Sequence, residues 1–478
     1  MSAALWTVKA MADAMHAHAS GRLPQSVGGL SIDSRTLQPG DAFFAIAGDK
    51  SDGHDYAESA LAAKAGLAVV SQAKSGQFGN DAPLLIVKEV LEGLRDLARA
   101  ARSRTAAKVI GVTGSVGKTG TKEALKLVLS RQGVTHASAA SYNNHWGVPL
   151  SLARCPGEAD YAIFEMGMNH SGEIGPLAKL VRPHIAIITA IAPVHLEYFK
   201  SLDDIADAKA EIFEGVEPGG AAILNRDGEY FERLAKNAAK AKIGKIVSFG
   251  EHDKADARLI QCALQPGSST VHADILGADV KYKIGAPGRH LVVNSLAVLA
   301  ASALAGADLA ISALALANLV PASGRGTQIP LALPGGTALL IDESYNANPV
   351  SMRAALALLG NAQIGPRGRR IAVLGDMLEL GKKADALHRE LADPILENAV
   401  DLVFCSGPAM HALWQALPSG RRGGYAEDSK GLESKVIDVV RAGDAIMVKG
   451  SNGSKMAPIV KALERAYARA PLDADSRN

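Results

Sequence analysis

The sequence is poor in cysteine and in aromatic residues. Its three cysteines, Cys155, Cys262 and Cys405, lie far apart along 478 residues. They have the spacing of neither a disulfide framework nor a metal site, so a reducing compartment such as the cytoplasm is favoured. Aromatic residues make up only 4% of the chain, whereas glycine occurs 48 times. Together with alternating strand and helix patterns, this composition favours α/β layers.

An excess of charge and a membrane-spanning run are also missing. The 51 basic and 49 acidic residues leave a formal net charge of +2, which gives no argument for nucleic acid or a membrane as a partner. The most apolar tract, residues 296–307, is too short to cross a bilayer. Lys9 and Asp13 interrupt the apolar core that a signal peptide would need. We therefore expect a cytoplasmic monomer that neither binds nucleic acid nor enters a membrane.

Length and pattern predict three domains, because 478 residues exceed what a single core accommodates. We expect a small α/β domain over residues 1–107, with a helix over 5–19. A central parallel-sheet domain over 108–323 follows, and then a third domain over 324–478 with four βα repeats, typical of a Rossmann-like sheet. No G-x-G-x-x-G motif follows a strand, so dinucleotide binding is not supported.

The strongest chemical signal is TGSVGKT at residues 113–119, between a predicted strand and a predicted helix. Inward-turned backbone N–H groups, a helix N-terminus, a lysine for the terminal phosphates and a threonine for Mg²⁺ make a phosphate cradle. The usual pattern would place its first glycine at Val112, whereas the glycines here are Gly111 and Gly114. A merely glycine-rich turn is the alternative. The complete GKT favours nucleotide binding by Gly114, Ser115, Val116, Gly117, Lys118 and Thr119.

Two polar residues follow predicted strands of the central domain. Glu165 ends the apolar run over 161–164, and His195 comes after the run over 184–191. Ligands of an open parallel sheet lie beyond the carboxyl ends of its strands, so Glu165 fits a Mg²⁺ ligand near the phosphates. The alternatives are a surface carboxylate for Glu165 and an ordinary loop residue for His195.

Two further polar residues lie in predicted helical segments, and each is interpreted from the residues around it. Lys209 lies in the charged helical stretch over 203–213, whose simplest interpretation is a solvated face. Asn294 lies inside an apolar helical region over 291–317. A buried amide needs a hydrogen-bonding partner, and the edge of a ligand could provide it.

Several segments together resemble the Mur ligases, the family that builds the peptide of the bacterial cell-wall precursor. They are TGSVGKT at 113–119, VHLEYF at 194–199, DAKAEIF at 207–213, RHLVVNSLAVLAA at 289–301 and IDESYNANPVSM at 341–352. NNHWGVPL, SYNANP and GDMLELG are the discriminating marks, while the Asp-Asn-Pro-Arg signature of the members that add the third amino acid is absent. The resemblance covers nearly the whole chain. It implies an ATP-dependent ligase that joins D-alanyl-D-alanine to UDP-N-acetylmuramoyl-tripeptide through an acyl phosphate.

The resemblance also implies a role for each matching residue. Lys118 and the loop amides would hold the β- and γ-phosphates of ATP, Thr119 and Glu165 would ligate Mg²⁺, and His195 would help to bind a second Mg²⁺. Lys209 matches a carbamoylated, metal-ligating lysine, whose formation requires an amine that has lost the proton it normally keeps up to pH about 10. The remaining matches are Asn294 with adenine, Arg325 with the γ-phosphate, Asp342 with the nucleotide, Ser34 and Arg35 with the uridine nucleotide, Asn143 and Asn144 with the muramoyl peptide, and Asn346 and Asn348 with the dipeptide.

Other interpretations remain open at this point. Within the same chemistry, the chain could be a related ligase that adds the third amino acid, or an enzyme similar to folylpolyglutamate synthase. From a different class, it could be a P-loop ATPase that moves or scaffolds a partner. Only a ligase requires an amine acceptor for ADP release. The position of Arg325 at a hinge predicts that it lies far from the phosphates when the domains are open.

Overall fold

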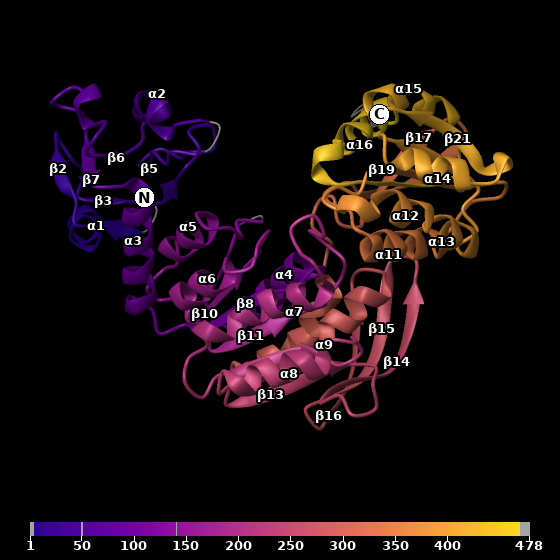
Figure 1. Ribbon diagram of the computed structural model, residues 1–478, viewed down its shortest axis with the longest axis horizontal. Helices are drawn as coiled ribbons and strands as arrows, with labels where there is room; N and C mark the ends of the chain where they lie inside the picture. The colour runs from indigo at the N-terminus through magenta and orange to yellow at the C-terminus, as the bar shows by residue number, and fades with distance from the viewer. Residues whose placement is uncertain (1–3, 49–50, 140, 469–478) are drawn as a thin grey trace, which may run out of the picture.

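The computed structural model describes residues 4–48, 51–139 and 141–468, which form three units along an arc (Figure 1). The indigo N-terminal unit and the orange-to-yellow C-terminal unit lie at opposite ends of the central unit. The units carry sheets of five, nine and six strands, respectively. The expected α/β class is confirmed. Among the described helices, none combines the length and apolarity needed to cross a bilayer.

The first unit departs from the helix expected over 5–19. The chain forms β1 (Trp6–Thr7), α1 (Val8–Met15) and β2 (His18–Ser20) there. The Thr7 side chain accepts a hydrogen bond from Ala10 N–H and so begins α1, while the left-handed His16 ends it. The sheet has the order β2, β7 (Leu84–Val87), β6 (Leu67–Ser71), β5 (Ala42–Phe44) and β4 (Leu30–Ser31), with β3 (Ser26–Val27) paired to β1 and α2 (Ala57–Ala62) outside it.

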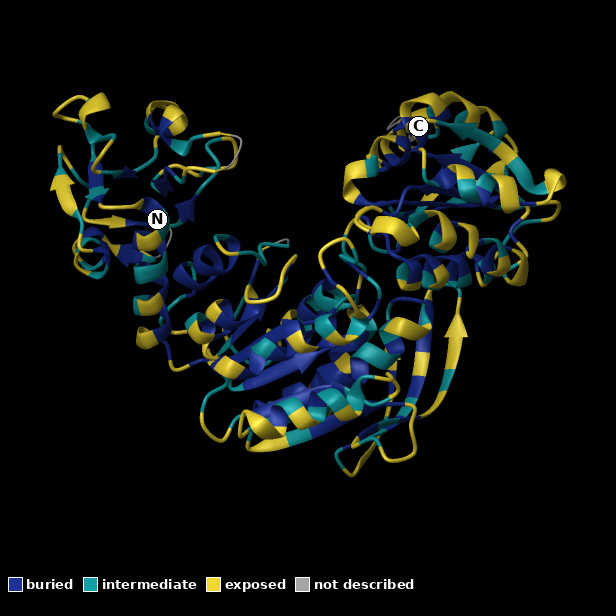
Figure 2. Cartoon of the chain, viewed as in Figure 1, coloured by how far each residue is buried: buried dark blue, intermediate teal, exposed yellow. Residues whose placement is uncertain are grey.

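The first two units share one hydrophobic core. Helix α3 (Val90–Arg104) leads into the central unit and packs against α5 (Gly147–Ala153). The buried side chains of Leu97 and Phe164 belong to the same cluster. In Figure 2 the strands at the centre of the middle unit are coloured as buried. The indole N–H of Trp6 donates to the Ala153 carbonyl at 2.8 Å, and the Arg104 guanidinium lies 3.4 Å from the centre of the indole. These contacts fix the N-terminal unit on the central one.

The central sheet reverses its strand order around β8 (Lys108–Thr113), which lies between β10 (Tyr161–Glu165) and β11 (Ile185–Ile188), both parallel to it. Such a reversal places ligands at the carboxyl ends of these strands. The remaining parallel strands are β9 (Thr135–Ala137), β12 (Ala221–Asn225) and β13 (Lys245–Gly250). The helices are α4 (Lys118–Leu129), α6 (Ile174–Val181), α7 (Leu202–Ala210), α8 (Phe231–Lys240), α9 (Arg289–Leu304) and α10 (Leu309–Ala315).

Three further strands, which the sequence did not predict, extend the central sheet: β14 (Ala257–Gln265), β15 (Ser268–Ile275) and β16 (Ala278–Ile284). β14 pairs parallel with β13, and the three strands pair antiparallel with one another in chain order. The hairpin of β14 and β15 reaches the C-terminal unit (Figure 1). At its tip the Pro266 carbonyl accepts a hydrogen bond from the Gln328 amide at 2.9 Å. The hairpin therefore bridges the two units.

The C-terminal sheet contains the four expected βα repeats. Its order is β17 (Thr327–Leu333), β18 (Gly336–Glu343), β22 (Ala445–Lys449), β19 (Arg370–Gly375), β20 (Leu402–Ser406) and β21 (Arg422–Ala426). The antiparallel β17 and the glycine-containing β21 were not predicted. The helices are α11 (Pro349–Gly360), α12 (Ala384–Arg389), α13 (Ala392–Glu397), α14 (Met410–Ala416), α15 (Lys430–Val439) and α16 (Ala457–Ala466).

Candidate active site

The glycine loop lies where the sequence predicts it, between the end of β8 and the start of α4. Gly114 has φ +145° and Gly117 has φ +88°, values that favour glycine. A Cβ on Gly114 would lie 2.0 Å from the Thr189 hydroxyl oxygen. No side chain caps α4 at its first residue, Lys118. The N–H groups of the first turn are therefore available to an anion.

The segment after β11 braces this loop. The Ser115 N–H donates to the Ala190 carbonyl at 2.7 Å, and its hydroxyl donates to the Ala192 carbonyl at 3.1 Å. The Thr189 hydroxyl donates to the Val116 carbonyl at 2.5 Å. The sequence analysis missed Thr189, although a polar residue directly after an apolar strand was the signal that identified Glu165. The loop is thus held in shape before any ligand arrives.

Lys118 folds back over the loop. Its ammonium donates to the Gly114 carbonyl at 2.7 Å. Burial lowers the pKa of Lys118; the Glu165 carboxylate acts in the opposite direction, and the Arg325 guanidinium lowers it further. Lys118 therefore lies within electrostatic reach of Glu165 and of Arg325.

The buried Glu165 forms a hydrogen-bonded cluster with the buried Thr119 and the half-buried Asn143. The Thr119 hydroxyl donates to one carboxylate oxygen at 2.9 Å, and the Asn143 amide donates to the other at 2.8 Å. Glu165 is 1% exposed, so the alternative of a surface carboxylate is wrong. A hydroxyl and a carboxylate side by side are hard oxygen ligands, and they fit a Mg²⁺ ion that takes its other ligands from phosphates and water.

His195 does not join this cluster. Its backbone adopts the left-handed conformation, with φ +56°. Its Nδ1 lies 2.5 Å from a carboxylate oxygen of Glu379 in the C-terminal unit. That hydrogen bond lowers the pKa of Glu379 below its usual range. Within the described residues, no three His, Cys, Asp or Glu side chains gather to hold a metal.

Lys209 is 1% exposed near the end of α7, so the interpretation of a solvated charged residue is wrong. Burial lowers its pKa well below the ordinary value, and the positive charge of Lys118 lowers it further. Across the described ranges, no hydrogen bond or ion pair holds its amine. The Glu211 carboxylate acts in the opposite direction, but burial has the larger effect and favours the neutral, nucleophilic amine.

Arg325 already lies beside the phosphate loop in this arrangement of the units. Its guanidinium lies 4.1 Å from the ring centre of Tyr345 and 3.5 Å from the hydroxyl of Ser141 in the central unit. Its charge acts on Lys118, as described above. The separation expected for an open arrangement of the domains stays a prediction.

Two residues expected at the nucleotide differ in their surroundings. Asn294 lies against the loop, because a Cβ on Gly117 would be 2.7 Å from its amide nitrogen. Asp342 is buried, and its two oxygens accept hydrogen bonds from Gly324 N–H at 3.1 Å and from the Ser344 hydroxyl at 2.6 Å. Its carboxylate thus stabilises the hinge, and its contact with the nucleotide stays a prediction.

The asparagines expected at the peptide substrates have different partners. Asn144 accepts a hydrogen bond from Gly147 N–H at the start of α5. Asn348 is the N-cap of α11, where it forms a capping box with Ser351. Asn346, in contrast, is exposed. Helix capping explains the local contacts of Asn348, whereas the exposed Asn346 accepts a hydrogen bond from Ala347 N–H at 2.9 Å. The contacts of all three asparagines with substrates stay predictions.

Ser34 and Arg35 lie in the N-terminal unit, and no described contact joins them to the phosphate loop. The Arg35 side chain is 86% exposed and forms a two-pronged hydrogen bond with Asp33 at 2.9 and 2.7 Å. The structure therefore brings together Lys118, Thr119, Glu165, Asn143, Asn294 and Arg325, and it leaves Ser34 and Arg35 apart from them.

Comparison with known proteins decides the family. Residues 112–302 match the Mur ligase middle domain, residues 331–452 match the Mur ligase glutamate ligase domain, and residues 26–103 match the Mur ligase family catalytic domain. The chain belongs to the Mur ligase family. The resemblance of its motifs is thereby confirmed, and as a Mur ligase the chain is an ATP-dependent ligase.

Relatives of this Mur ligase match it along nearly the whole length. The UDP-N-acetylmuramoyl-tripeptide–D-alanyl-D-alanine ligase of Escherichia coli is 35% identical over 436 residues, which are 91% of this chain and 93% of the relative. The same-named ligase of Rickettsia prowazekii is 34% identical over 90% of this chain and 94% of its own. A crystal structure of MurF from Acinetobacter baumannii superimposes with a TM-score of 0.82 at 28% identity, covering 96% of this chain and 99% of its own.

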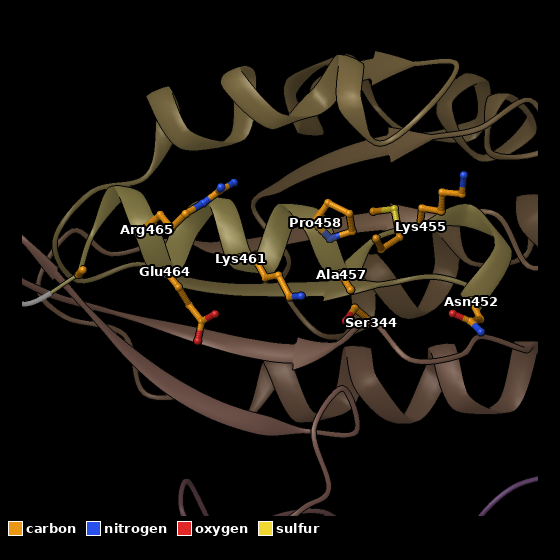
Figure 3. Close-up of a pocket in the computed structure, with 10 residues that line it drawn as sticks. Ser344, Asn452, Lys455, Ala457, Pro458, Lys461, Glu464 and Arg465 are labelled. Carbon is orange, nitrogen blue, oxygen red and sulfur yellow. The ribbon is translucent and has the colours of Figure 1, made fainter. Parts of the chain in front are cut away.

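Two cavities of this Mur ligase lie away from the phosphate loop. One of about 850 Å³ is in the C-terminal unit, where Lys461 and Glu464 of α16 extend from the helix near Ser344 (Figure 3). Another, of about 620 Å³, lies between α3, α5 and α6, and His145 and Gly167 line it. Lys118 and Glu165 line neither cavity. The predicted site at the phosphate loop is therefore separate from both cavities.

Proposed function

We propose that this Mur ligase joins D-alanyl-D-alanine to UDP-N-acetylmuramoyl-tripeptide, with ATP converted to ADP and phosphate, and so completes a peptidoglycan precursor. Relatives with that name from Rickettsia prowazekii, Escherichia coli and Bacillus subtilis share 33–35% identity over at least nine-tenths of each chain, which supports this substrate pair. The observation that carries the chemistry is the buried Thr119–Glu165 pair beside Lys118 and Arg325.

The arrangement suits the activation of a carboxylate. A carboxylate is a poor electrophile, because its charge repels nucleophiles and oxide is a very poor leaving group. Transfer of the γ-phosphoryl group to it gives an acyl phosphate, which removes both obstacles. Carboxylate and γ-phosphate repel each other, so Lys118 and Arg325 reduce the barrier by holding positive charge between them before the reaction. Magnesium at Thr119 and Glu165 would supply further charge at the phosphate oxygens.

The amine of the dipeptide then attacks the acyl carbon. The tetrahedral oxyanion that forms is stabilised by the same lysine and arginine, and phosphate leaves. Because water also hydrolyses acyl phosphates, the C-terminal unit must close the site during this step. Arg325 is well placed to link closure with catalysis, because it follows the hinge and already contacts the central unit through Ser141.

We propose the following roles for the other predicted residues. Lys209 is carbamoylated, which its buried and unpaired amine supports, and with His195 it contributes to a second Mg²⁺ site. Asn294 binds the nucleotide from the side of Gly117. The uridine nucleotide binds at Ser34 and Arg35, the muramoyl peptide binds near Asn143, and the dipeptide binds near the exposed Asn346. The domains span residues 1–107, 108–323 and 324–478, and the enzyme acts as a monomer in the cytoplasm, where ATP is available.

An amine-dependence assay tests the proposal. ADP release is measured with ATP and UDP-N-acetylmuramoyl-tripeptide, with and without D-alanyl-D-alanine. We expect rapid ADP release only when the dipeptide is present, together with a product whose mass is the sum of the two substrates less water. Activation by a single amino acid on a shorter precursor would indicate the ligase that adds the third residue. Activation by glutamate on a folate would indicate a folylpolyglutamate-synthase-like enzyme, and release without any amine would indicate an ATPase.

A further inference from the structure

Arg325 lies in a tight bend between two glycines at the hinge. Gly324 has φ +73° and Gly326 has φ +97°, both in the left-handed region. The Gly326 N–H donates to the Asp342 carbonyl at 2.8 Å, and the Tyr345 N–H donates to the Gly324 carbonyl at 3.1 Å. A Cβ on Gly324 would lie 2.9 Å from the Cβ of Tyr345, so glycine permits this close approach. The bend and the segment after β18 are therefore tied together.

The aromatic ring of Tyr345 supports the guanidinium of Arg325. The ring centre lies 4.1 Å from the guanidinium, within the range of a cation–π contact. The residue is 38% exposed, and among the described residues its hydroxyl has no hydrogen-bond partner. The contact with Arg325 therefore uses the face of the ring and not its polar end.

A buried lysine holds the backbone that carries this ring. The ammonium of Lys449, at the end of β22, donates to the Asn346 carbonyl and to the Glu343 carboxylate, both at 2.9 Å. Lys449 is 2% exposed, so water does not compete for these contacts. Tyr345 lies between Glu343 and Asn346, and its own N–H is bonded to the hinge. The ring is thus attached to a backbone that is fixed on both sides.

The guanidinium of Arg325 reaches from the hinge to the central unit. One of its terminal nitrogens lies 3.5 Å from the Ser141 hydroxyl oxygen, and its charge acts on Lys118 of the phosphate loop. The uncapped first turn of α4 makes this loop suited to an anion. A free arginine side chain samples many rotamers, and fixing one of them costs conformational entropy. Contact with Tyr345 lowers that cost, because the guanidinium is already ordered when an anion arrives.

We propose that Tyr345 is a positioning residue for Arg325: its ring covers one face of the guanidinium and leaves the in-plane N–H groups for an anion at the phosphate loop. This inference rests on the proposed function, in which Arg325 interacts with the γ-phosphate. Tyr345 itself touches no reacting group. Positive charge must be in place before the γ-phosphoryl group moves, so loss of the ring should reduce kcat and not the affinity for the uridine nucleotide.

Steady-state kinetics of ring variants test this role. ADP release is measured for the full-length wild type, Tyr345→Phe and Tyr345→Leu at saturating ATP and dipeptide. We expect Tyr345→Leu to lower kcat about 3- to 30-fold, the equivalent of one cation–π contact, with KM for UDP-N-acetylmuramoyl-tripeptide unchanged. Tyr345→Phe retains the ring face and should retain most of the rate.

The matched control is another ring–guanidinium contact of the C-terminal unit. The Trp414 ring centre lies 5.6 Å from the Arg422 guanidinium, at the opposite edge of the sheet from β18. Trp414→Leu removes that contact and should lower the thermal midpoint while kcat stays at the wild-type value. A loss of kcat in Trp414→Leu equal to that in Tyr345→Leu would show that the effect is one of stability, and it would overturn the inference.

A double variant separates positioning from direct contact with a substrate. If Tyr345 acts through Arg325, Tyr345→Leu adds no further loss of kcat in an Arg325→Ala background. Full additivity of the two losses, an equal loss in Tyr345→Phe, or wild-type kcat in Tyr345→Leu would overturn the inference. The ratio of each variant to the wild type can be measured with any acceptor that supports ADP release, so the inference can fail while the proposed function stands. That function fails separately if ADP release does not depend on D-alanyl-D-alanine.

Discussion

The hydroxyl of Thr119 donates a hydrogen bond of 2.9 Å to the carboxylate of Glu165. Thr119 lies in the first turn of α4, and Glu165 ends β10, on the neighbouring parallel strand to β8. The bond therefore ties the start of the phosphate-binding helix to the next strand of the sheet. Because both side chains are buried, the pair is ordered without a ligand, and little reorganisation is needed when a cation binds.

Thr119→Val should weaken Mg²⁺ binding, and it also removes one hydrogen bond from the buried Glu165 carboxylate. Loss of one hydrogen bond to a charged group costs about 1.5 kcal/mol, so we expect an increase of about tenfold in the Mg²⁺ concentration for half-maximal ADP release. The matched control is Thr121→Val on the same helix, where the hydroxyl is buried without a hydrogen-bond partner among the described residues. Thr121→Val should leave Mg²⁺ dependence unchanged and raise the thermal midpoint. Equal Mg²⁺ dependence of the two variants would contradict the metal role of Thr119.

Lys118→Ala should reduce kcat by at least ~10²-fold, the effect of losing one preorganised electrostatic contact. The measurement is dipeptide-dependent ADP release at saturating ATP. The control, Lys126→Ala, removes an exposed lysine from the same helix and should keep wild-type rates. Wild-type kcat in Lys118→Ala would remove this lysine from the mechanism.

Lys209→Ala should be nearly inactive, and acetate or another small carboxylate should restore part of its activity by replacing the lost anion. In wild-type enzyme supplied with ¹³C-bicarbonate, we expect a carbamate signal in the ¹³C spectrum that disappears in Lys209→Ala. Lys200→Ala, which removes an exposed lysine, should retain the signal. Active, metal-loaded enzyme without any carbamate signal would count against the modification.

Asn346 and Asn348 should give opposite results. Asn348→Ala removes the N-cap of α11, so it should lower the stability of the C-terminal unit by about 1 kcal/mol while KM changes little. Asn346→Ala removes an exposed amide, so it should raise KM for D-alanyl-D-alanine and leave the thermal midpoint unchanged. If Asn346→Ala leaves this KM at its wild-type value, the dipeptide does not bind through Asn346.

The stability of the fold should fall in mildly acidic solution because of His136. Burial lowers the pKa of His136 to about 4, and its ring Nε2 lies 2.7 Å from the Ser151 carbonyl. The unfolded chain takes up the proton near pH 6.5, whereas the folded chain does so only near pH 4. Between these values the unfolded state binds more protons, so stability decreases as the pH falls from about 6.5 to about 4.

His136→Gln removes this titration and should make the thermal midpoint less sensitive to pH between 7.5 and 5. The matched control His18→Gln replaces an exposed histidine and should behave like the wild type. An unchanged pH sensitivity in His136→Gln would show that other groups cause the loss.

The parts of the site that depend on sequence neighbours were predictable. The phosphate loop and Glu165 are defined by an apolar strand directly before them, and both lie where expected. The burial of Lys209 was not predictable, because its sequence neighbours are charged and only the tertiary fold buries it. The pairing of His195 with Glu379 joins residues that are remote in the sequence, and no local pattern encodes it.

Other differences between the predicted and the observed elements have causes in the local sequence. An asparagine just before a helix often caps it, and this rule would have identified the capping role of Asn348. The helix expected over 5–19 contains a threonine that begins α1 late and a histidine that ends it early. Strand β14 has mostly exposed and intermediate positions, so it lacks the apolar run that identified the buried strands.

The core that crosses from α3 to α5 limits how parts of this enzyme can be recombined with those of its relatives. In a chimera joined near residue 107, α3 and α5 would come from different proteins. The hydrogen bond between the Trp6 indole and the Ala153 carbonyl would then have to form between two segments that did not evolve together. A junction near residue 324 instead separates elements whose hydrophobic clusters are distinct. Exchange of the C-terminal unit is therefore the more tolerant graft, and dipeptide specificity is the property that such a graft should carry with it.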